Sequence, residues 1–171
     1  MRRLRYSVAM SLDGFIADDE GGYDWITQDD GMDFAAYLAK IDTLVMGRGT
    51  WEIMDGPDGA ELVDMMEVYV VSTTLPADVD PRVTVIGADV TTAVADLKAR
   101  EGRDIWLFGG GVLFRSMLEA GLVDRVEVGV IPALLGSGIP FLPGLDGIAK
   151  LDLHSQEAFE SGIVLLKYDV A

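Results

Sequence analysis

The sequence lacks cysteine and contains a single histidine, His154, among its 171 residues. Without cysteine the chain can form no disulfide, and a Cys–His catalytic pair is impossible. The same shortage argues against a zinc site, and we expect no metal. A Ser–His–Asp arrangement would have to use His154. This histidine lies in an alternating segment, 151–155, where we expect the leucines to face inward and the histidine to face solvent.

Long apolar runs and positive charges are also scarce. No run approaches the roughly 20 residues that span a bilayer, and the basic start is followed by too short an apolar stretch for a secretory signal. We therefore expect a cytoplasmic protein. Thirteen basic and 29 acidic residues give a net charge of −16, which repels nucleic acid and anionic membranes. It would also repel a phosphorylated cofactor, so any phosphate site should contain one of the few arginines.

The most informative segment is 105–118, where a short apolar run ends in Gly109-Gly110-Gly111 and a helical pattern begins at once. Three consecutive glycines cost backbone entropy, so we expect something to approach the main chain closely here. A helix N-terminus at this turn would offer unpaired N–H groups and a positive dipole end to a phosphate. The turn matches neither G-x-G-x-x-G nor a P-loop, and a tight turn without a ligand stays open as the alternative.

Hydrophobic patterns predict alternating strands and helices along the chain. Strands are expected near residues 4–10, 43–46, 68–71, 82–86, 105–108, 126–131, 151–158 and 163–170. Helices are expected from about Met32 through Ile41, over 51–54, 60–66 and 90–100, and from the triple glycine to Gly121. Residues 18–31 and 132–147 resemble long loops. This order, with 50% hydrophobic residues, predicts one α/β domain over residues 1–171. Its sheet is doubly wound and mostly parallel, with antiparallel C-terminal strands.

Small and polar residues follow four of the predicted strands directly. They are Asp13-Gly14, Gly47-Arg48-Gly49-Thr50, Ser72-Thr73-Thr74 and the triple glycine. Ligands of doubly wound sheets bind at the carboxyl ends of the strands, so these four strand ends describe one coherent site. Arg48 supplies the cation that a phosphate needs, because arginine binds phosphate bidentately and stays charged. The alternative is a surface arginine paired with Glu52.

With these segments in order, the chain resembles the dihydrofolate reductase superfamily. Within it, the chain is most similar to stand-alone relatives of the reductase domain of bifunctional riboflavin biosynthesis proteins. The matching stretches run in family order and are residues 9–17, 45–52, 71–74, 108–113, 121–126 and 131–138. The resemblance implies an NADPH-dependent reductase of a small heterocycle. Such an enzyme needs positioning and a proton source, but no nucleophile or metal of its own.

The resemblance also implies roles for individual residues on the cofactor side. Gly47, Arg48, Gly49 and Thr50 resemble the family turn that holds the adenosine phosphates, with Ser72 and Thr73 beside the ribose phosphate. Gly109 and Gly110 resemble a glycine pair joined by a cis peptide. The backbone N–H groups of Gly110, Gly111, Val112 and Leu113 would face the pyrophosphate. The backbone groups of Ala9 and Ile16 would meet the nicotinamide carboxamide.

On the substrate side, the resemblance implies that Asp33 is the catalytic acid that binds the substrate ring, although Asp29 or Asp30 could compete for this role. Asp33 could equally be an ordinary acidic residue in the first turn of a helix. Asp13 would line the substrate side, or would simply form an Asp-Gly turn. The loop around 18–30, with Trp25, would be a lid over nicotinamide and substrate.

Three functions stay open. The first is a reductase of the riboflavin type, whose substrate is a ribosylaminopyrimidine phosphate. The second is a dihydrofolate reductase, and the third is a non-catalytic nucleotide-binding protein. Dihydrofolate needs a cation for its glutamate tail, and residues 32–42 offer only Lys40. A sugar phosphate needs a cation near the lid, and residues 13–31 contain none. The resemblance further implies a homodimer formed through the C-terminal edge hairpin.

Overall fold

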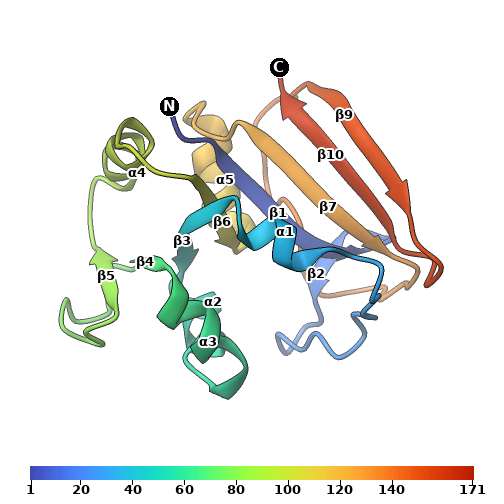
Figure 1. Cartoon of the computed structure of the whole chain (residues 1–171), viewed down its shortest axis with the longest axis horizontal. Coiled ribbons are helices and arrows are strands. Elements are labelled where there is room, and N and C mark those ends of the chain that lie inside the picture. The colour runs from blue at the N-terminus through green and yellow to red at the C-terminus, as the bar shows by residue number, and fades with distance from the viewer.

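Eight strands form one sheet in the computed structural model of the chain, which describes residues 1–171 except the side chains of Pro57 and Asp58. The strand order is β5-β4-β3-β6-β1-β7-β10-β9, and the sheet fans across the molecule (Figure 1). The strands are β1 (Leu4–Ser11), β3 (Ile41–Gly47), β4 (Glu67–Val71), β5 (Val83–Ile86), β6 (Asp104–Gly109), β7 (Arg125–Ile131), β9 (Leu151–Ala158) and β10 (Val164–Val170). The strands from β5 to β7 are parallel, whereas β10 runs antiparallel to both of its neighbours. The predicted fold class is confirmed.

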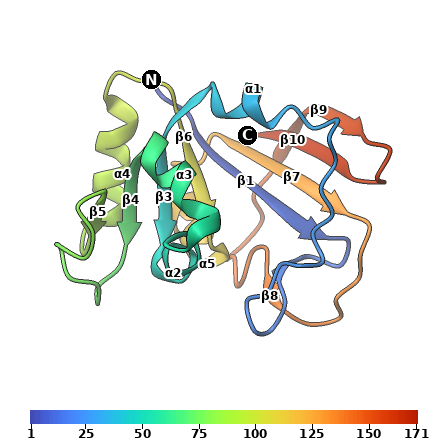
Figure 2. The same ribbon diagram turned by 60° about the horizontal axis from the view of Figure 1, so that its bottom comes forward.

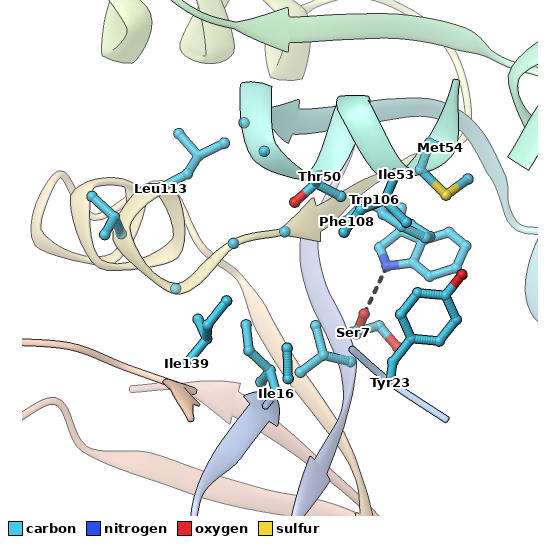
Figure 3. Close-up of a pocket in the computed structure, with 18 of the residues that line it drawn as sticks. Ser7, Ile16, Tyr23, Thr50, Ile53, Met54, Trp106, Phe108, Leu113 and Ile139 are labelled. Carbon is cyan, nitrogen blue, oxygen red and sulfur yellow. Dashed lines mark hydrogen bonds between the residues drawn. The ribbon is translucent and has the colours of Figure 1, made fainter. Parts of the chain in front are cut away.

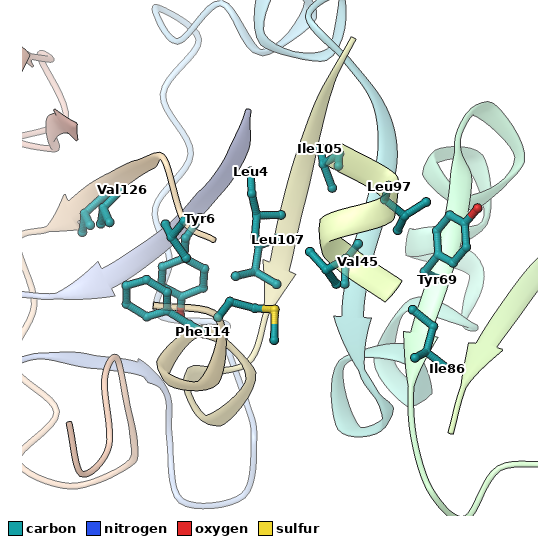
Figure 4. Close-up of a cluster of buried hydrophobic side chains, with 14 residues drawn as sticks. Leu4, Tyr6, Val45, Tyr69, Ile86, Leu97, Ile105, Leu107, Phe114 and Val126 are labelled. Atoms are coloured by element: carbon teal, nitrogen blue, oxygen red, sulfur yellow. The ribbon is translucent and has the colours of Figure 1, made fainter. Parts of the chain in front are cut away.

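Five helices cover the two faces of the sheet. They are α1 (Phe34–Leu38), α2 (Arg48–Met54), α3 (Pro57–Met65), α4 (Val90–Ala99) and α5 (Gly111–Glu119). One buried cluster joins the sheet to α4 and α5 through side chains such as Leu97 and Phe114 (Figure 4). Within it, the rings of Tyr6 and Phe114 stack at 3.8 Å. The second cluster packs Trp51 of α2 and Val63 of α3 against the opposite face.

Some helix and strand ends follow the local signals and others do not. Gly121 lies directly after the C-cap of α5 with φ +66°, the left-handed conformation that favours glycine. The helix expected over 51–54 begins three residues earlier, so that Arg48 is the first residue of α2. The helix expected to reach Ile41 ends at Leu38 instead, and that expectation was wrong. Ile41 begins β3 and pairs with Asp104 of β6, so sheet pairing overrides the helical spacing of its side chain.

A second, two-stranded sheet escapes the sequence analysis because both of its strands are very short. It pairs β2 (Phe15–Ala17) with β8 (Ile139–Pro140). Figures 1 and 2 place it beyond the carboxyl end of β1. The Asp13 carboxylate supports it by accepting hydrogen bonds from the backbone N–H groups of Leu135 and Gly136, at 3.1 and 2.7 Å. The segment just before the first predicted loop is thereby tied to the second predicted loop.

The C-terminal hairpin differs from the rest of the sheet in its exposure. All eight residues of β9 are exposed, including Leu151 at 40% and Leu153 at 55%. The expectation that these leucines face inward was wrong, because β9 is the outermost strand and the two buried clusters lie elsewhere. His154 is indeed open to solvent, with 47% of its side chain exposed, and lies 3.3 Å from the Asp169 carboxylate.

Candidate functional site

The site opens where two parallel strands part. The pairing of β1 with β6 covers Leu4–Tyr6 against Ile105–Leu107, whereas the pairing of β1 with β7 continues to Ser11. Beyond Tyr6, one edge of β1 therefore faces a cleft instead of a neighbouring strand. The Trp106 indole N–H donates to the Ser7 carbonyl at 2.9 Å across the start of this gap (Figure 3).

A large cavity of about 1610 Å³ occupies this gap and extends over the carboxyl ends of β1, β3 and β6. Its volume exceeds the roughly 300–1,000 Å³ of a pocket for one small ligand, so it has room for a dinucleotide together with a second molecule. Many of the predicted cofactor-binding residues line it: Ala9, Ile16, Gly47, Gly49, Thr50, Gly109, Gly110, Gly111, Val112 and Leu113. Of the four strand-end motifs that were expected to converge, two contribute to its wall, the Gly47–Thr50 turn and the triple glycine, whereas Asp13-Gly14 and Ser72–Thr74 do not.

The triple glycine brings three segments together. The peptide between Gly109 and Gly110 is cis, as the resemblance implied. A Cβ at Gly109 would lie 2.9 Å from the Thr50 hydroxyl, and one at Gly111 would lie 2.7 Å from the Pro140 carbonyl oxygen. The close approach predicted for this turn is thus made by the protein itself at two of the three glycines. Gly110, the N-cap of α5, meets only the Thr50 hydroxyl, at 4.0 Å.

Arg48 lies at one end of this arrangement, beside the end of β4. Its guanidinium donates to the Thr74 hydroxyl at 3.1 Å and lies 3.5 Å from the Glu52 carboxylate. The buried Ser72 hydroxyl accepts from the backbone N–H groups of Thr74 and Leu75 and so holds the loop after β4 in place. Arg48, Ser72 and Thr73 do not line the large cavity. Arg48 thus makes the ion pair with Glu52 that was the alternative to a phosphate role. It also contacts the Ser72–Thr74 turn through Thr74.

The other end of the cavity is walled by large side chains. Trp106 packs edge-on against Phe108, with ring centres 4.5 Å apart, and against Phe34, at 5.9 Å. Figure 3 shows Trp106, Met54 and Tyr23 gathered at this end, and Leu113 and Ile139 at the opposite one. Tyr23 and Ile26 come from the predicted lid, and Ile53, Met54, Leu62 and Met65 come from α2 and α3. We call this end of the cleft the apolar half.

A second cavity of about 370 Å³ adjoins the apolar half and shares Ser7, Phe34 and Trp106 with it. Its floor is a buried ion pair in which the Arg5 guanidinium donates to both Glu127 oxygens, at 2.8 and 2.9 Å. Burial opposes the charge of Arg5, but the hydrogen bonds and charge of Glu127 outweigh this effect and raise the pKa of Arg5. Asp33, Lys40, Glu157 and Lys167 line the remaining walls.

The three residues predicted for substrate binding have different places. Asp33 lines the second cavity and caps α1 by accepting from the Ala36 N–H at 2.8 Å. Asp13 and Trp25 line neither cavity. Hydrogen bonds from the Ser11 hydroxyl and from the Gly136 and Leu135 backbone hold the pKa of Asp13 below its usual value. The half-buried Trp25 donates its indole N–H to the Gly22 carbonyl.

The predicted lid is fastened at its far end. The Asp29 carboxylate accepts from the Ser161 N–H at 3.0 Å, in the turn between β9 and β10, and from the Gly31 N–H at 2.8 Å. These contacts, together with those of the Ser161 hydroxyl, lower the pKa of Asp29. Asp29 thus anchors the loop. Of Asp29 and Asp33, two candidates for the substrate role, Asp33 lines a cavity and Asp29 does not.

Sequence reasoning missed most of the apolar half. Phe34, Leu38, Ile53 and Met65 fit the pattern of core-facing helix residues, yet Phe34, Ile53 and Met65 are 53%, 45% and 60% exposed. The available signal was helix length, because α1 and α2 have five and seven residues and cannot bury all their apolar side chains against the sheet.

Within the described part of the chain, no group of three or more His, Cys, Asp and Glu side chains could hold a metal ion. None of the described helices has the length and apolar character needed to cross a bilayer.

Comparison with known sequences gives a consistent result. The family model of the RibD C-terminal domain matches residues 2–165. The uncharacterized protein YyaP of Bacillus subtilis strain 168 is 32% identical over 178 residues, which cover 98% of this chain and 94% of YyaP. The riboflavin biosynthesis protein RibD of Corynebacterium ammoniagenes is 30% identical over 149 residues. That alignment covers 78% of this chain and 44% of RibD.

Solved structures agree on the fold. A protein of Shewanella sp. PV-4 that is named for riboflavin biosynthesis superposes with a TM-score of 0.80 at 27% identity, covering 100% of this chain and 99% of its own. A diaminohydroxyphosphoribosylaminopyrimidine deaminase/5-amino-6-(5-phosphoribosylamino)uracil reductase of Thermotoga maritima gives a TM-score of 0.73 at 19% identity. It covers 99% of this chain and 57% of the Thermotoga chain, and at this identity it shows the fold alone. The chain therefore belongs to the RibD C-terminal domain family and has the dihydrofolate reductase-like fold of that family.

Proposed function

We propose that the protein is an NADPH-dependent reductase of a small heterocyclic substrate. The observation that carries this proposal is the continuous cavity across the carboxyl ends of β1, β3 and β6, with a glycine-rich turn on one side and an aromatic wall on the other. Membership of a family that contains reductase domains of riboflavin biosynthesis proteins supports it. When bound, the dinucleotide would supply the hydride.

The residues around the glycine turn fit the phosphates of a dinucleotide. The nine-residue helix α5 begins at Gly111 on the wall of the cavity, so its unpaired N–H groups are available to a pyrophosphate. Arg48 and the Ser72–Thr74 turn, which it contacts through Thr74, would hold an additional ribose phosphate. Because the chain carries a net charge of −16, this guanidinium would offset the repulsion of that phosphate by the protein.

The substrate ring would lie between the nicotinamide and the second cavity. Asp33 would accept hydrogen bonds from ring N–H groups with the carboxylate oxygen that does not cap α1. The free edge of β1 at Ala9 would orient the nicotinamide carboxamide. Trp106 and Phe34 would exclude water from the reacting atoms, which strengthens the electrostatic interactions between the bound groups.

The test is cofactor binding followed by turnover. We expect the protein to bind NADPH more tightly than NADH, and to oxidise NADPH in the presence of one member of a panel of pterins and aminopyrimidines. Oxidation is followed at about 340 nm, where reduced nicotinamide absorbs. Equal affinity for the two cofactors would remove Arg48 from its proposed role. Tight NADPH binding without turnover of any compound would favour a non-catalytic nucleotide-binding protein.

We also propose that the chain forms a homodimer through β9. An exposed outer strand of eight residues can pair with a second strand, and this strand presents Leu151 and Leu153 to solvent, with Ile148 just before it at 90% exposure. We expect light scattering to give twice the mass of the chain. Leu153→Lys should shift this mass toward the monomer, and a wild-type monomer at micromolar concentration would exclude the proposal.

A further inference from the structure

We propose that the substrate carries an apolar arm and no phosphate, and that this arm lies in the apolar half of the cleft, between the lid and helices α2 and α3. The inference rests on the proposed function, since it names the substrate class for the same cleft. Its two supports are the side chains that wall this half and the signs of the charges around it.

The apolar walls are open to solvent although they line a cavity. Phe34, Ile53 and Met65 are all more than 40% exposed, and they come from three different helices. Tyr23, also 44% exposed, faces them from the lid. Contiguous apolar side chains that stay exposed at the rim of a cavity indicate a binding surface for an apolar group. A ligand arm that filled this space would bury several of these side chains at once.

The charged side chains that line the apolar half are all acidic. Residues 6–39 and 49–81, which supply the lid, α1, α3 and all of α2 except Arg48, contain eight acidic residues each and no lysine, arginine or histidine. Arg48 is paired with Glu52, Arg82 is paired with Asp55 and Asp64, and neither arginine lines the cavity. Among the described residues that line the large cavity, the charged ones are Glu20, Glu52 and Glu61. A phosphate placed there would find no cation among the described residues of the cavity wall and would be repelled by these carboxylates. A neutral or protonated arm fits.

The adjoining second cavity has a different character and would take the polar edge of the substrate ring. Its charges are balanced, because Arg5 is paired with Glu127, and Asp33 and Glu157 line the same walls as Lys40 and Lys167. The ring of Tyr37 also lines this cavity, and its hydroxyl is buried. A ring with donors on one edge would pair with Asp33, and would direct its substituent toward Ile53 and Met65.

The test compares two probes that share one pyrimidine ring. They are 6-(benzylamino)uracil and 6-(ribosylamino)uracil 5′-phosphate, titrated calorimetrically with and without saturating NADP⁺. We expect the benzylamino compound to bind at least about tenfold more tightly, since filling an apolar pocket with a few carbon atoms has this effect. Ile53→Ser and Met65→Ser should each weaken the benzylamino compound severalfold and leave the phosphate unchanged. Leu134→Ser, which changes an exposed apolar residue outside both cavities, is the matched control. Glu61→Lys should improve binding of the phosphate.

The outcomes separate this inference from the proposed function. Tighter binding of the phosphate by the wild-type protein overturns the inference, as does failure of both probes when NADPH binds. Binding of the benzylamino compound that depends on Ile53 and Met65 supports it, even if NADPH fails to bind and the reductase proposal falls. Absence of binding by NADPH and by the benzylamino compound overturns both.

Discussion

The two halves of the cleft are built from different parts of the chain. Near the triple glycine the wall is mostly main chain and small side chains, held in place by close packing such as that of Gly111 against Pro140. In the apolar half the wall consists of aromatic and aliphatic side chains, including Trp106, Ile53 and Met65. A backbone wall can change only if the fold changes, whereas a side-chain wall changes with single substitutions. Single substitutions in the apolar half can therefore change which molecule binds there and leave the main-chain half of the cleft as it is.

The largest expected effect concerns the charged floor beside the apolar half. Glu127→Gln should lower the free energy of unfolding by about 3–5 kcal/mol, because it leaves the buried Arg5 guanidinium without its main partner. Urea unfolding measures this loss. Glu52→Gln is the control, since Glu52 pairs with Arg48 at 3.5 Å in an exposed i,i+4 pair, and we expect a change within about 0.5 kcal/mol. Equal effects of the two substitutions would contradict a structural role of the buried pair.

The next effect concerns the phosphate end of the other half. Arg48→Ala should weaken NADPH binding about 10- to 100-fold, because hydrogen bonds to a charged group contribute about 1.5–3 kcal/mol, and should leave NADH binding unchanged. Glu52→Gln removes the carboxylate that now lies 3.5 Å from Arg48 and should improve NADPH binding about twofold to fivefold. Fluorescence titration of the wild-type protein and the two variants measures these affinities. A parallel loss of NADH binding in Arg48→Ala would point to a general structural effect.

A pair of glycine substitutions separates packing from ligand contact in the backbone wall. Gly111→Ala should cost about 1–3 kcal/mol of stability, since its Cβ would clash with Pro140 and Pro143. Gly49→Ala meets nothing within 4 Å and should stabilise α2 by about 0.5–1 kcal/mol. Because Gly49 lines the cavity, its methyl group should still weaken NADPH binding. Thermal unfolding with and without NADPH measures both effects, and unchanged affinity in Gly49→Ala would place the cofactor farther from α2.

The smallest expected effect is a pH dependence at Asp13. Its folded pKa is lowered from 3.8, first by the Ser11 hydroxyl and then by the Gly136 backbone. Its contribution to stability is therefore fully present above about pH 4 and is lost as the pH falls through the lowered value. We expect Asp13→Asn to reduce the melting temperature slightly at pH 7 and to flatten its decline in acid. A decline that is identical in both proteins would show that Asp13 does not contribute.

The backbone half of the cleft could be predicted from the sequence because its signals are local. Glycine and arginine directly after a strand mark a site whatever the rest of the chain does, and Gly47, Arg48 and Gly109 lie at strand ends as expected. The family resemblance added the cis peptide between Gly109 and Gly110. Parallel strands bring their carboxyl ends to one edge of the sheet, and the alternation of strands and helices predicts parallel strands.

The side-chain half could not be predicted, because an apolar residue in a short helix has the same pattern whether it contacts the core or a ligand. Phe34 and Met65 are examples. The ion pair of Arg5 with Glu127 joins residues 122 positions apart, and its position depends on the register of β1 against β7, in which Ser7 pairs with Glu127. The inward leucines expected in β9 failed for a related reason, since alternation does not say whether a face is covered.

The parting of β1 from β6 has a consequence for how occupancy can be detected. Alternate amide protons of β1 after Tyr6 point away from β7 into the cleft, where the β6 ladder has ended. We expect these protons to exchange with solvent deuterium until a molecule bound in the cleft accepts hydrogen bonds from them. Slower amide exchange at these residues of β1 would then report that a ligand fills the cleft. This measurement needs neither a change in absorbance nor turnover.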